Sequence, residues 1–349
     1  MNDLQSGTNN PSRVNPFFSV IIVNYNAGAM LTRVMSALSG QTYRHFEVIV
    51  IDNNSQDHSW CATENLPFPC RLVRLQENTG FAAANNLAVR EHAQGDWLFL
   101  LNPDAFPEPD CLETVARGIN FFPTINCFGC ALISARQPDR LDGLGDAYHV
   151  SGLHWRQGHG DSYRTTPTDP KEIFSACAAA AVYRTTVFRQ LGGFDETYFA
   201  YSEDVDLGFR LRLAGGQTLL LPQARVHHVG SGITGRSSDF SIYHGHRNLT
   251  WTFIKNVPGP LLPLLFPLHL AMIFCLAIVF AATGRFWPYF RAKTDAFSRI
   301  GHAWGQRKTI QNTRVCSCMD LLRLMSWLPR SIQVRAPVRY ENTTPQEKL

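Results

Sequence analysis

Four short apolar runs, alternating with helix-like segments, constrain the fold of this chain more than any other feature. The runs cover residues 17–23, 47–51, 71–75 and 97–101. Short runs rich in β-branched and aromatic residues and bounded by turns predict buried strands. Apolar residues at helical spacing follow the first run, and an Ala-rich segment from Gly80 to Val89 precedes the fourth. This alternation predicts an α/β fold with a mainly parallel central sheet.

Acidic residues follow two of these predicted strands. Asp52 begins the turn Asp52-Asn53-Asn54-Ser55 after the second run, and Asp104 ends Asn102-Pro103-Asp104 after the fourth. Each sequence alone is an ordinary turn. Ligands of parallel α/β sheets bind at the carboxyl ends of strands, however. Two acids at the same edge of the sheet therefore favour a binding cleft there.

Residues 192–210 combine five carboxylates with several aromatic side chains after a Gly-Gly turn. Solvated surfaces rarely carry so many aromatics, and cores rarely tolerate so many unpaired acids. A carboxylate in a partly dry cleft is suited to act as a general base. We expect one of these carboxylates to have that role. Asp195 and Glu196 are expected to form a structured turn, and Asp206 to cap or pair locally.

The segment after Asp204 is ambiguous by periodicity. Apolar residues alternate from Val205 to Leu213, which favours a strand, whereas Gly215-Gly216 is equally suited to end a helix. We predict a helix. Before it, residues 142–146 and 154–160 are rich in Gly, His and Trp and are expected to form long loops over a cleft.

His227-His228, followed by Gly230-Ser231-Gly232, is a fourth polar motif. The other three are those of Asp52, Asp104 and the pair Glu203-Asp204. A divalent cation that binds with a nucleotide diphosphate needs one or two carboxylates, sometimes an imidazole, and room for phosphate oxygens and water. Asp104 and one of the two histidines would supply such protein ligands. Asp52 could then hydrogen-bond a nucleobase or ribose, which leaves Asp204 to deprotonate an attacking hydroxyl.

Five motifs in sequence order resemble glycosyltransferase family 2, and within it the rhamnosyltransferase-like bacterial enzymes that build surface polysaccharides. The resemblance covers about residues 17–256, and the ordered set is far more specific than any one motif. The motifs are Ser19-Val20-Ile21-Ile22-Val23-Asn24-Tyr25-Asn26, Val50-Ile51-Asp52-Asn53-Asn54-Ser55, Glu77-Asn78-Thr79-Gly80-Phe81, Leu101-Asn102-Pro103-Asp104, and the stretch from Gly193-Phe194-Asp195-Glu196 to Asp204-Val205-Asp206-Leu207.

The resemblance implies a GT-A fold, a nucleotide-diphospho-sugar donor, Mg²⁺ or Mn²⁺, and inversion at the anomeric carbon. It implies that Asp204 is the catalytic base, that Glu203 orients the acceptor, and that Asp104 binds the metal with His227, which we prefer to His228. Asn102 stands where many relatives have Asp, so the metal site carries one charge fewer. The implied donor contacts are Asn24, Asn26, Asp52, Asn54, Asn78, Gly80, Asn102 and Arg247. For Arg247, a packing salt bridge is an equally weighted alternative to a diphosphate contact.

A second constraint is the apolar stretch from Leu261 to Ala282, whose one strongly polar side chain is His269. Its length suits one membrane span of about 20 residues. Pro263 and Pro267 leave open a re-entrant or in-plane hairpin. Membrane contact is favoured over a buried core helix because basic and aromatic residues follow at once, from Arg285 to Lys293.

Charge and topology place the protein on the cytoplasmic face of the bacterial inner membrane. The net charge is +4, and from residue 284 onward twelve Lys and Arg stand against four Asp and Glu. A single complete span would separate the catalytic body from this basic tail, so hairpin or monotopic insertion is expected. The tail has an amphipathic pattern that suits a membrane surface and makes lipid a better partner than nucleic acid. The apolar residues of this pattern, interleaved with Arg323 and Arg330, are Leu321, Leu322, Leu324, Met325 and Leu328.

Nine cysteines, an odd number, follow an N-terminus without a secretory signal, so reduced thiols in the cytosol are expected. Cys127, Cys130, Cys316 and Cys318 could form a zinc site, but ordinary buried thiols are favoured because the spacing is weak.

We therefore expect a disordered tail (1–16), a GT-A glycosyltransferase domain (17–256), an apolar membrane-associated segment (257–283) and a basic, partly amphipathic C-terminal region (284–349). The expected activity is the transfer of one sugar, rhamnose or a similar one, to a hydroxyl of a lipid-linked saccharide. Two alternatives remain, a processive polysaccharide synthase and a non-catalytic, membrane-bound protein that binds nucleotide sugars. The sequence has one long apolar run and no Arg-Trp dipeptide, which disfavours a processive synthase, and the Glu203-Asp204 pair disfavours a non-catalytic role.

Overall fold

Four parallel strands form one half of a ten-stranded sheet, in the order β3-β2-β1-β4. They are β1 (Phe18–Asn24), β2 (Phe46–Asp52), β3 (Cys70–Arg74) and β4 (Trp97–Leu101), and their bounds confirm the four predicted runs. The structure, a computed structural model, describes residues 14–230 and 238–328. The predicted N-terminal tail therefore lies almost wholly outside the described residues, as do Ser231, Gly232 and the last 21 residues.

The other half of the sheet is mixed. Strand β11 (Ala180–Arg184) runs antiparallel between β4 and β6 (Cys127–Ser134), and β12 (Thr218–His228) lies parallel to β6. Three short strands add to this half: β10 (Lys171–Glu172) and β5 (Ala105–Pro107) pair with β12, and β7 (Leu141–Gly143) pairs with β6. The predicted α/β class with a mostly parallel central sheet is confirmed, with β11 as the antiparallel junction between its two halves.

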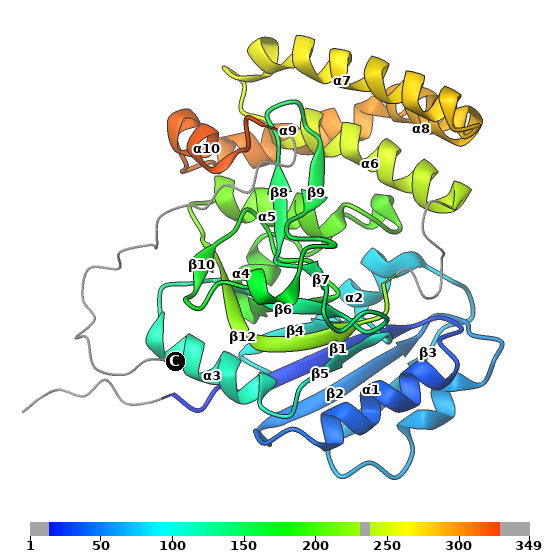
Figure 1. The fold of residues 1–349 in the computed structure, drawn as a ribbon, viewed down its shortest axis with the longest axis vertical. Helices are drawn as coiled ribbons and strands as arrows, with labels where there is room; N and C mark the ends of the chain where they lie inside the picture. The colour runs from blue at the N-terminus through cyan, green and yellow to red at the C-terminus, as the bar shows by residue number, and fades with distance from the viewer. Residues whose placement is uncertain (1–13, 231–237, 329–349) are drawn as a thin grey trace, which may run out of the picture.

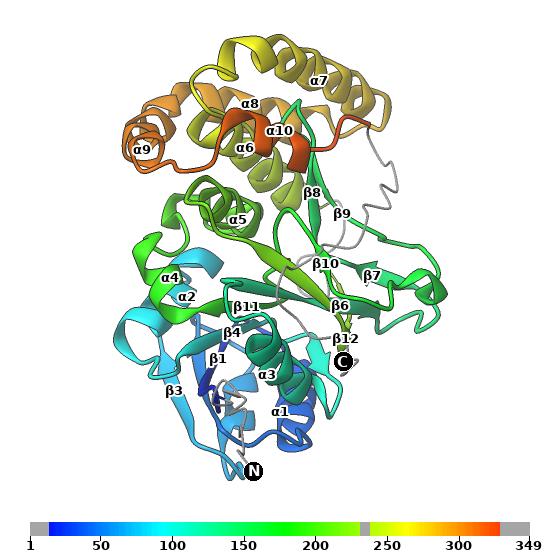
Figure 2. The same ribbon diagram turned by 90° about the vertical axis from the view of Figure 1, so that its left-hand side faces the viewer.

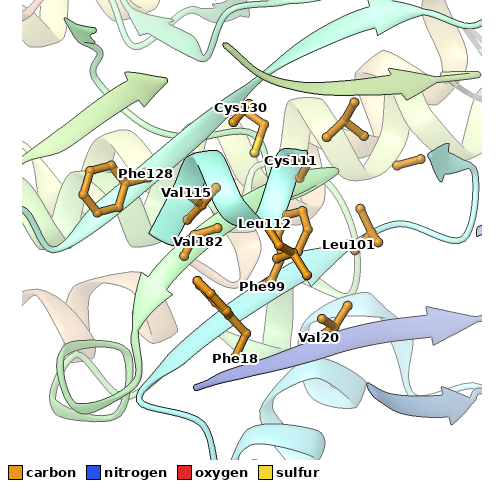
Figure 3. Packing of buried hydrophobic residues seen from close by; sticks show 14 of the residues in the cluster. Phe18, Val20, Phe99, Leu101, Cys111, Leu112, Val115, Phe128, Cys130 and Val182 are labelled. Atoms are coloured by element: carbon orange, nitrogen blue, oxygen red, sulfur yellow. The ribbon is translucent and has the colours of Figure 1, made fainter. Parts of the chain in front are cut away.

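Helices cover both faces of the sheet (Figures 1 and 2). Helices α1 (Ala29–Ser39) and α3 (Cys111–Phe121) pack on one face, and α2 (Gly80–Glu91), α4 (Thr185–Gln190) and α5 (Glu203–Leu213) pack on the other. Figure 3 shows Phe18, Val20 and Phe99 of the strands beside Leu112 and Val115 of α3. The strands are continuous apolar runs because side chains on both of their faces are buried.

Helix α5 confirms the prediction made for residues after Asp204. Its apolar residues are nearly all buried, and Asp206, Arg210 and Arg212 are buried as well. The helix lies between the sheet and a second layer of helices (Figures 1 and 2). A helix covered on nearly every side loses the 3.6-residue alternation of a surface helix, which explains the ambiguous pattern.

The second layer of helices follows β12. It consists of α6 (Asp239–Asn256), α7 (Leu262–Ala282), α8 (Phe286–Ser298), α9 (Ile300–Asn312) and α10 (Cys318–Leu324). Leu321 and Met325 are fully buried in a cluster shared with α5 and α6, and Leu322 and Leu324 pack against it. The expectation that these leucines face a membrane surface is therefore wrong for most of them; Leu328 alone of the set is well exposed.

Short strands occupy part of each of the two expected loops, residues 142–146 and 154–160. Strands β8 (Asp146–Tyr148) and β9 (His154–Arg156) form a hairpin that rises from the sheet toward the second layer of helices (Figure 1). The remaining short elements are the 3₁₀ turns η1 (Ser59–Thr63), η2 (Tyr163–Thr165) and η3 (Glu196–Tyr198). Cys127 and Cys130 are buried in β6, and residues 14–230 and 238–328 contain no cluster of three or more potential His, Cys, Asp or Glu metal ligands.

Candidate active site

Asp52 and Asn24 are neighbours at the carboxyl ends of β2 and β1. The Asn24 amide donates to Asp52 Oδ1 at 2.8 Å and to the Ser59 hydroxyl at 2.8 Å. Asp52 is 1% exposed, and the Ser55 backbone N–H donates to its second oxygen at 3.4 Å. Asn24 and Asp52 are thus a buried polar pair at the edge of the sheet. Their hydrogen bonds to Ser55 and Ser59 fix the turn that follows β2.

A second set of amide contacts joins this turn to the start of α2. Asn53 accepts from the Thr79 backbone N–H at 2.9 Å, and its amide donates to Asn78 Oδ1 at 2.9 Å. Gly80 has φ +87°, and a Cβ there would lie 2.6 Å from the Phe199 ring. The close approach of the backbone to the loop before Glu203 therefore requires glycine. Asn26 and Asn54, two other predicted contacts of the sugar donor, have positive φ angles. Asn26 Oδ1 accepts from the Gln56 backbone N–H, and Asn54 Oδ1 accepts from the Gln56 side-chain amide.

The turn after β4 places Asp104 against β12. The Asn102 backbone N–H donates to Ala179 O at 3.0 Å, and Asp104 is 5% exposed. His228 Nε2 lies 3.3 Å from Asp104 Oδ1, and His228 Nδ1 lies 2.7 Å from Asp142 Oδ2. His227, the preferred histidine in the sequence analysis, points to the other side and lies 3.1 Å from Glu108. The geometry thus pairs Asp104 with His228 in place of His227.

The environment of His228 is strongly acidic. Burial would lower the pKa of His228, but hydrogen bonds to Asp104 and Asp142 raise it above its ordinary value. Burial would raise the pKa of Asp142, but His228 and Arg156 hold it well below its usual range. Asp142 thus fixes the imidazole through Nδ1, and Nε2 faces Asp104. In metal sites, a carboxylate at the second ring nitrogen orients the histidine ligand in the same way.

Asp204 lies at the N-terminus of α5, on the same edge of the sheet. The Ala178 backbone N–H donates to its Oδ2 at 3.0 Å, and the Val205 backbone N–H donates to its Oδ1 at 2.8 Å. Ala178 precedes Ala179, which accepts the hydrogen bond from Asn102. One short loop therefore contacts both the predicted base and the turn that carries Asp104.

Two further carboxyls surround Asp204. Burial and the charge of Asp204 raise the pKa of Asp146 to about 8, and the same two causes raise the pKa of Glu203 well above its ordinary value. Both carboxyls therefore keep their protons to a higher pH than ordinary carboxyls do. Glu203 is 6% exposed, and its Oε2 has no hydrogen-bond partner among the residues that the structure describes. A buried carboxyl with a spare oxygen can form a hydrogen bond with a substrate hydroxyl.

Arg156 of β9 lies among these acids. Its guanidinium pairs with Asp142, and the charges of Asp146 and Asp204 also act on it. Together, Asp142, Asp146 and Arg156 join the site through β7, β8 and β9. Sequence reasoning placed this segment over a cleft but assigned it no functional residue. The only available signal was two aspartates and a basic residue in a Gly- and His-rich stretch.

The loop before Asp204 is held in a strained conformation. Phe199, Tyr201 and Ser202 have φ angles of 63°, 70° and 67°. Non-glycine residues in this region cost about 1–3 kcal/mol each and persist only where the surroundings impose them. His154 Nε2 lies 2.9 Å from the Ser202 hydroxyl, directly before Glu203. The strain thus lies next to the predicted catalytic pair.

Arg247 and Asn248 impose this loop conformation from α6. The Asn248 amide lies within 3.0 Å of three backbone carbonyls, those of Tyr198, Ala200 and Tyr201. Arg247 is 6% exposed and donates to the carbonyls of Thr197 and Tyr198. Of the two roles weighed for Arg247, the geometry favours neither a diphosphate contact nor a salt bridge, because its guanidinium bonds loop carbonyls.

Replacing Asn248 with Ala is expected to release this loop. The loss of amide donors to buried carbonyls should lower stability by about 1–3 kcal/mol. Misplacement of Glu203 and Asp204 should lower kcat by up to about 10²-fold, with little change in donor KM. Steady-state kinetics and thermal unfolding measure the two effects. Asn312→Ala, at an exposed position of α9, is the matched control. An unchanged kcat in a folded Asn248→Ala variant would contradict the role assigned to the hydrogen bonds of Asn248.

Comparisons with known proteins relate this chain to glycosyltransferases. The family model described as Glycosyl transferase family 2 matches residues 19–192. The chain is 30% identical over 259 residues to the N-acetylglucosaminyl-diphospho-decaprenol L-rhamnosyltransferase of Mycobacterium tuberculosis, a match that covers 68% of this chain and 83% of that protein. It is also 30% identical over 230 residues to the O-antigen biosynthesis protein RfbC of Myxococcus xanthus, but covers only 18% of that protein.

Two solved structures share the fold. GalNAc-T7 with UDP, GalNAc and Mn²⁺ superposes with a TM-score of 0.57 at 18% identity, over 69% of this chain and 48% of that one. The mannosyltransferase PcManGT from Pyrobaculum calidifontis, in complex with GDP-Man and Mn²⁺, gives a TM-score of 0.51 at 20% identity, over 84% and 87% of the two chains.

The mixed sheet with acidic residues at its carboxyl edge, together with these matches, defines a glycosyltransferase with a GT-A-like fold. The resemblance seen in the sequence is thereby confirmed. The chain belongs to glycosyltransferase family 2, and its donor substrate is a nucleotide sugar.

Proposed function

We propose that this protein transfers a single sugar, rhamnose or a similar one, from a nucleotide-diphospho-sugar to a hydroxyl of a lipid-linked saccharide. The transfer inverts the configuration at the anomeric carbon and serves the synthesis of a cell-surface polysaccharide. The observation that carries this proposal is the position of Asp204, held by Ala178 beside the turn that bears Asp104. The similarity to a rhamnosyltransferase named for a diphospho-decaprenol substrate supports the choice of sugar and acceptor.

In the proposed reaction, Asp204 accepts the proton of the acceptor hydroxyl as the oxygen attacks the anomeric carbon. The new bond forms between the acceptor oxygen and that carbon, and the bond from the carbon to the diphosphate oxygen breaks. The nucleoside diphosphate leaves with the electron pair. Glu203 orients the acceptor by a hydrogen bond through its free Oε2, while Asn24 and Asp52 hold the pocket for the nucleoside.

The side chains of Asp104 and His228 fit a divalent cation. They present one carboxylate oxygen and one imidazole nitrogen 3.3 Å apart, and Asp142 holds the imidazole by its other nitrogen. Such a pair suits Mg²⁺ or Mn²⁺ when diphosphate oxygens and water complete the coordination. A bound cation supplies positive charge against the departing diphosphate. Asn102 adds no charge, so tight binding of the ion would depend on the donor.

The helical layer supports a monotopic position at the cytoplasmic face of the inner membrane. Helix α7 has 21 residues and a mean hydropathy of 2.5, the one helix in the described part of the chain long and apolar enough to cross a membrane. It runs along α8, however, and its one strongly polar side chain, His269, lies 2.7 Å from Ser151 O of the β8–β9 hairpin. We therefore propose that residues 17–256 form the catalytic unit and that α7 lies in the membrane plane.

A panel of nucleotide sugars tests the proposed function. The purified protein is incubated with each donor and with N-acetylglucosaminyl-diphospho-polyprenol in detergent, and nucleotide release and the lipid product are measured. We expect one donor, deoxythymidine- or uridine-linked, to give a product that is one sugar longer and inverted. Successive additions would support a processive synthase instead. Donor binding without turnover on any acceptor would support a non-catalytic protein.

Removal of divalent cations is expected to abolish transfer. With EDTA in excess, nucleotide release should fall to background, and Mn²⁺ or Mg²⁺ should restore it, because the carboxylate of Asp104 repels the leaving diphosphate unless a cation lies between them. His228→Gln should raise the Mn²⁺ concentration needed for half-maximal rate, whereas His227→Gln should not. Full activity in EDTA, or equal effects of the two variants, would contradict the assignment of the metal site to Asp104 and His228.

A further inference from the structure

A groove lies between α7 and α8 in the second layer of helices. Its volume is about 520 Å³, within the range of roughly 300–1,000 Å³ typical of small-molecule sites. Its lining is almost entirely apolar, and the hydroxyl of Tyr289 is occupied because it donates to Ile273 O at 2.7 Å. Besides these two residues, the lining consists of Ala277, Phe286, Phe290, Lys293, Thr294 and Phe297. Only a hydrocarbon fills such a groove without losing hydrogen bonds to water.

The walls of the groove continue into an exposed apolar surface. Phe286, Phe290 and Phe297 of α8 are 36%, 46% and 40% exposed, and the outer side of α7 exposes Leu264 and Phe274 by 70% and 67%. A helix that is apolar all round but covered on one side only is expected to contact lipid or a partner. Exposed Arg285, Arg291 and Arg299 lie around α8 and can face anionic headgroups. The groove therefore belongs to the face proposed to enter the membrane.

Lys293 connects the groove to the helix that holds the catalytic loop. Its ammonium donates to His246 O at 2.7 Å and to the Thr250 hydroxyl at 2.9 Å, both on α6. Between these two residues, Arg247 and Asn248 bond the carbonyls of residues 197–201. One end of the groove thus lies against the turn of α6 that fixes the loop before Glu203 and Asp204. A chain lying in the groove has its polar end near the elements that position the site.

We propose that the α7–α8 groove binds the hydrocarbon chain of the lipid-linked acceptor. This rests on the function proposed above, because only a lipid-linked acceptor needs to keep its chain in the membrane face and its saccharide near Asp204. Bulk phospholipid would cover all of the exposed side of α7 alike. A groove that runs between two helices to α6 favours the one lipid whose head must reach the catalytic loop.

Filling the groove tests the proposal. Ala277→Trp places an indole in it, and Ala271→Trp places the same group on the exposed side of α7, outside the lining. Transfer is measured to two acceptors with the same saccharide diphosphate, one on a long polyprenol and one on a ten-carbon chain. We expect Ala277→Trp to raise KM for the long-chain acceptor at least tenfold and to leave the short-chain acceptor and the donor unchanged. Ala271→Trp should match the parent. Equal losses on both acceptors, or the same effect from both variants, would overturn the proposal.

A readout independent of turnover separates this inference from the proposed function. A polyprenyl diphosphate carrying a benzophenone, without any sugar, is photolysed with the parent protein in phospholipid nanodiscs, and the labelled peptides are mapped. Labels on α7 and α8 that Ala277→Trp abolishes, and that excess phospholipid does not displace, support the groove even if no transfer occurs. Labels elsewhere, or labels displaced by phospholipid, refute it even in an active enzyme.

Discussion

Replacing Asp204 with Asn is expected to lower kcat for sugar transfer by about 10³-fold, within the range of a lost general base, while donor binding stays close to that of the parent. The carboxylate is held by the backbone N–H groups of Ala178 and Val205. An asparagine fits the same space but cannot accept the proton of an attacking hydroxyl. The donor contacts proposed at Asn24, Asp52 and Asp104 lie on other elements, so they should remain.

The variant should remain folded. The amide oxygen can still accept from Val205, and the loss of the hydrogen bond from Ala178 should cost about 1 kcal/mol. A gain opposes this cost. The charge of Asp204 is one of the causes that raise the pKa of Asp146 and of Glu203, so removing it lessens the repulsion among the three acids. Stability close to that of the parent is therefore expected near neutral pH.

Single-turnover transfer and donor titration by calorimetry measure the two effects separately. Glu196→Gln is the matched control, because Glu196 is an exposed acid of the same stretch whose Oε1 only accepts from Asn86. It should behave as the parent does. A kcat for Asp204→Asn within tenfold of the parent value, with the protein folded, would show that another group is the base, and Asp146 would be the next candidate.

The strands could be read from the sequence because burial on both faces makes them continuous apolar runs. The choice between His227 and His228 could not. Side chains alternate along a strand, and β12 carries a shift in its pairing with β6 between Leu221 and Arg225. A shift of one residue exchanges the two faces of a strand. Pro222 lies in this segment and is typical of a bulge, but it does not tell how many residues the bulge contains. The sequence therefore identified the pair of histidines but not the member that faces Asp104.

The sequence also could not predict which side chains act by hydrogen bonding to the backbone of a distant loop. The resemblance implied either a diphosphate contact or a packing salt bridge for Arg247, yet its guanidinium bonds carbonyls of a loop about 50 residues earlier in the chain. Leu321 and Met325 formed an amphipathic pattern, which is equally typical of a helix that faces a membrane and of one that faces a protein core. Which of these surfaces a side chain meets is decided by tertiary packing, and the sequence gives only the pattern.

Replacing Lys255 with Met is expected to lower the free energy of unfolding by about 3–5 kcal/mol, the usual cost of removing one partner of a buried ion pair. Lys255 is fully buried on α6, and its ammonium lies 2.7 Å from Asp195 Oδ2 and 2.8 Å from Asp206 Oδ1. Arg210 also pairs with Asp206, at 2.9 Å. Asp195, at 7% exposure, keeps only Thr197 and His302 as polar partners when the ammonium is lost.

The ion pairs also join the acidic stretch to the site. Asp206 lies two residues after Asp204 on α5, and Asp195 precedes the strained loop. Lys255 therefore fixes both ends of the segment that presents Asp204. Asp195→Asn in the Lys255→Met background removes the charge left without a cation, so the double variant should recover part of the lost stability. Lys308→Met, at an exposed position of α9, should change stability by less than about 0.5 kcal/mol.

The pH dependence distinguishes a charge effect from a packing effect. Burial alone would raise the pKa of both Asp195 and Asp206, but Lys255, with Arg210 at Asp206, holds both below their ordinary value. A depressed carboxyl pKa contributes stability that is fully present above the unfolded pKa of about 4 and is lost as pH falls through the folded value. Without the ammonium, burial should raise the pKa of Asp195. Protonation of Asp195 as pH falls then removes the unpaired buried charge of the variant, and the variant loses less stability. Denaturant unfolding at pH 8 and pH 5 should therefore show a smaller difference between parent and variant at pH 5. A difference independent of pH, with no recovery in the double variant, would mean that Lys255 acts through packing alone.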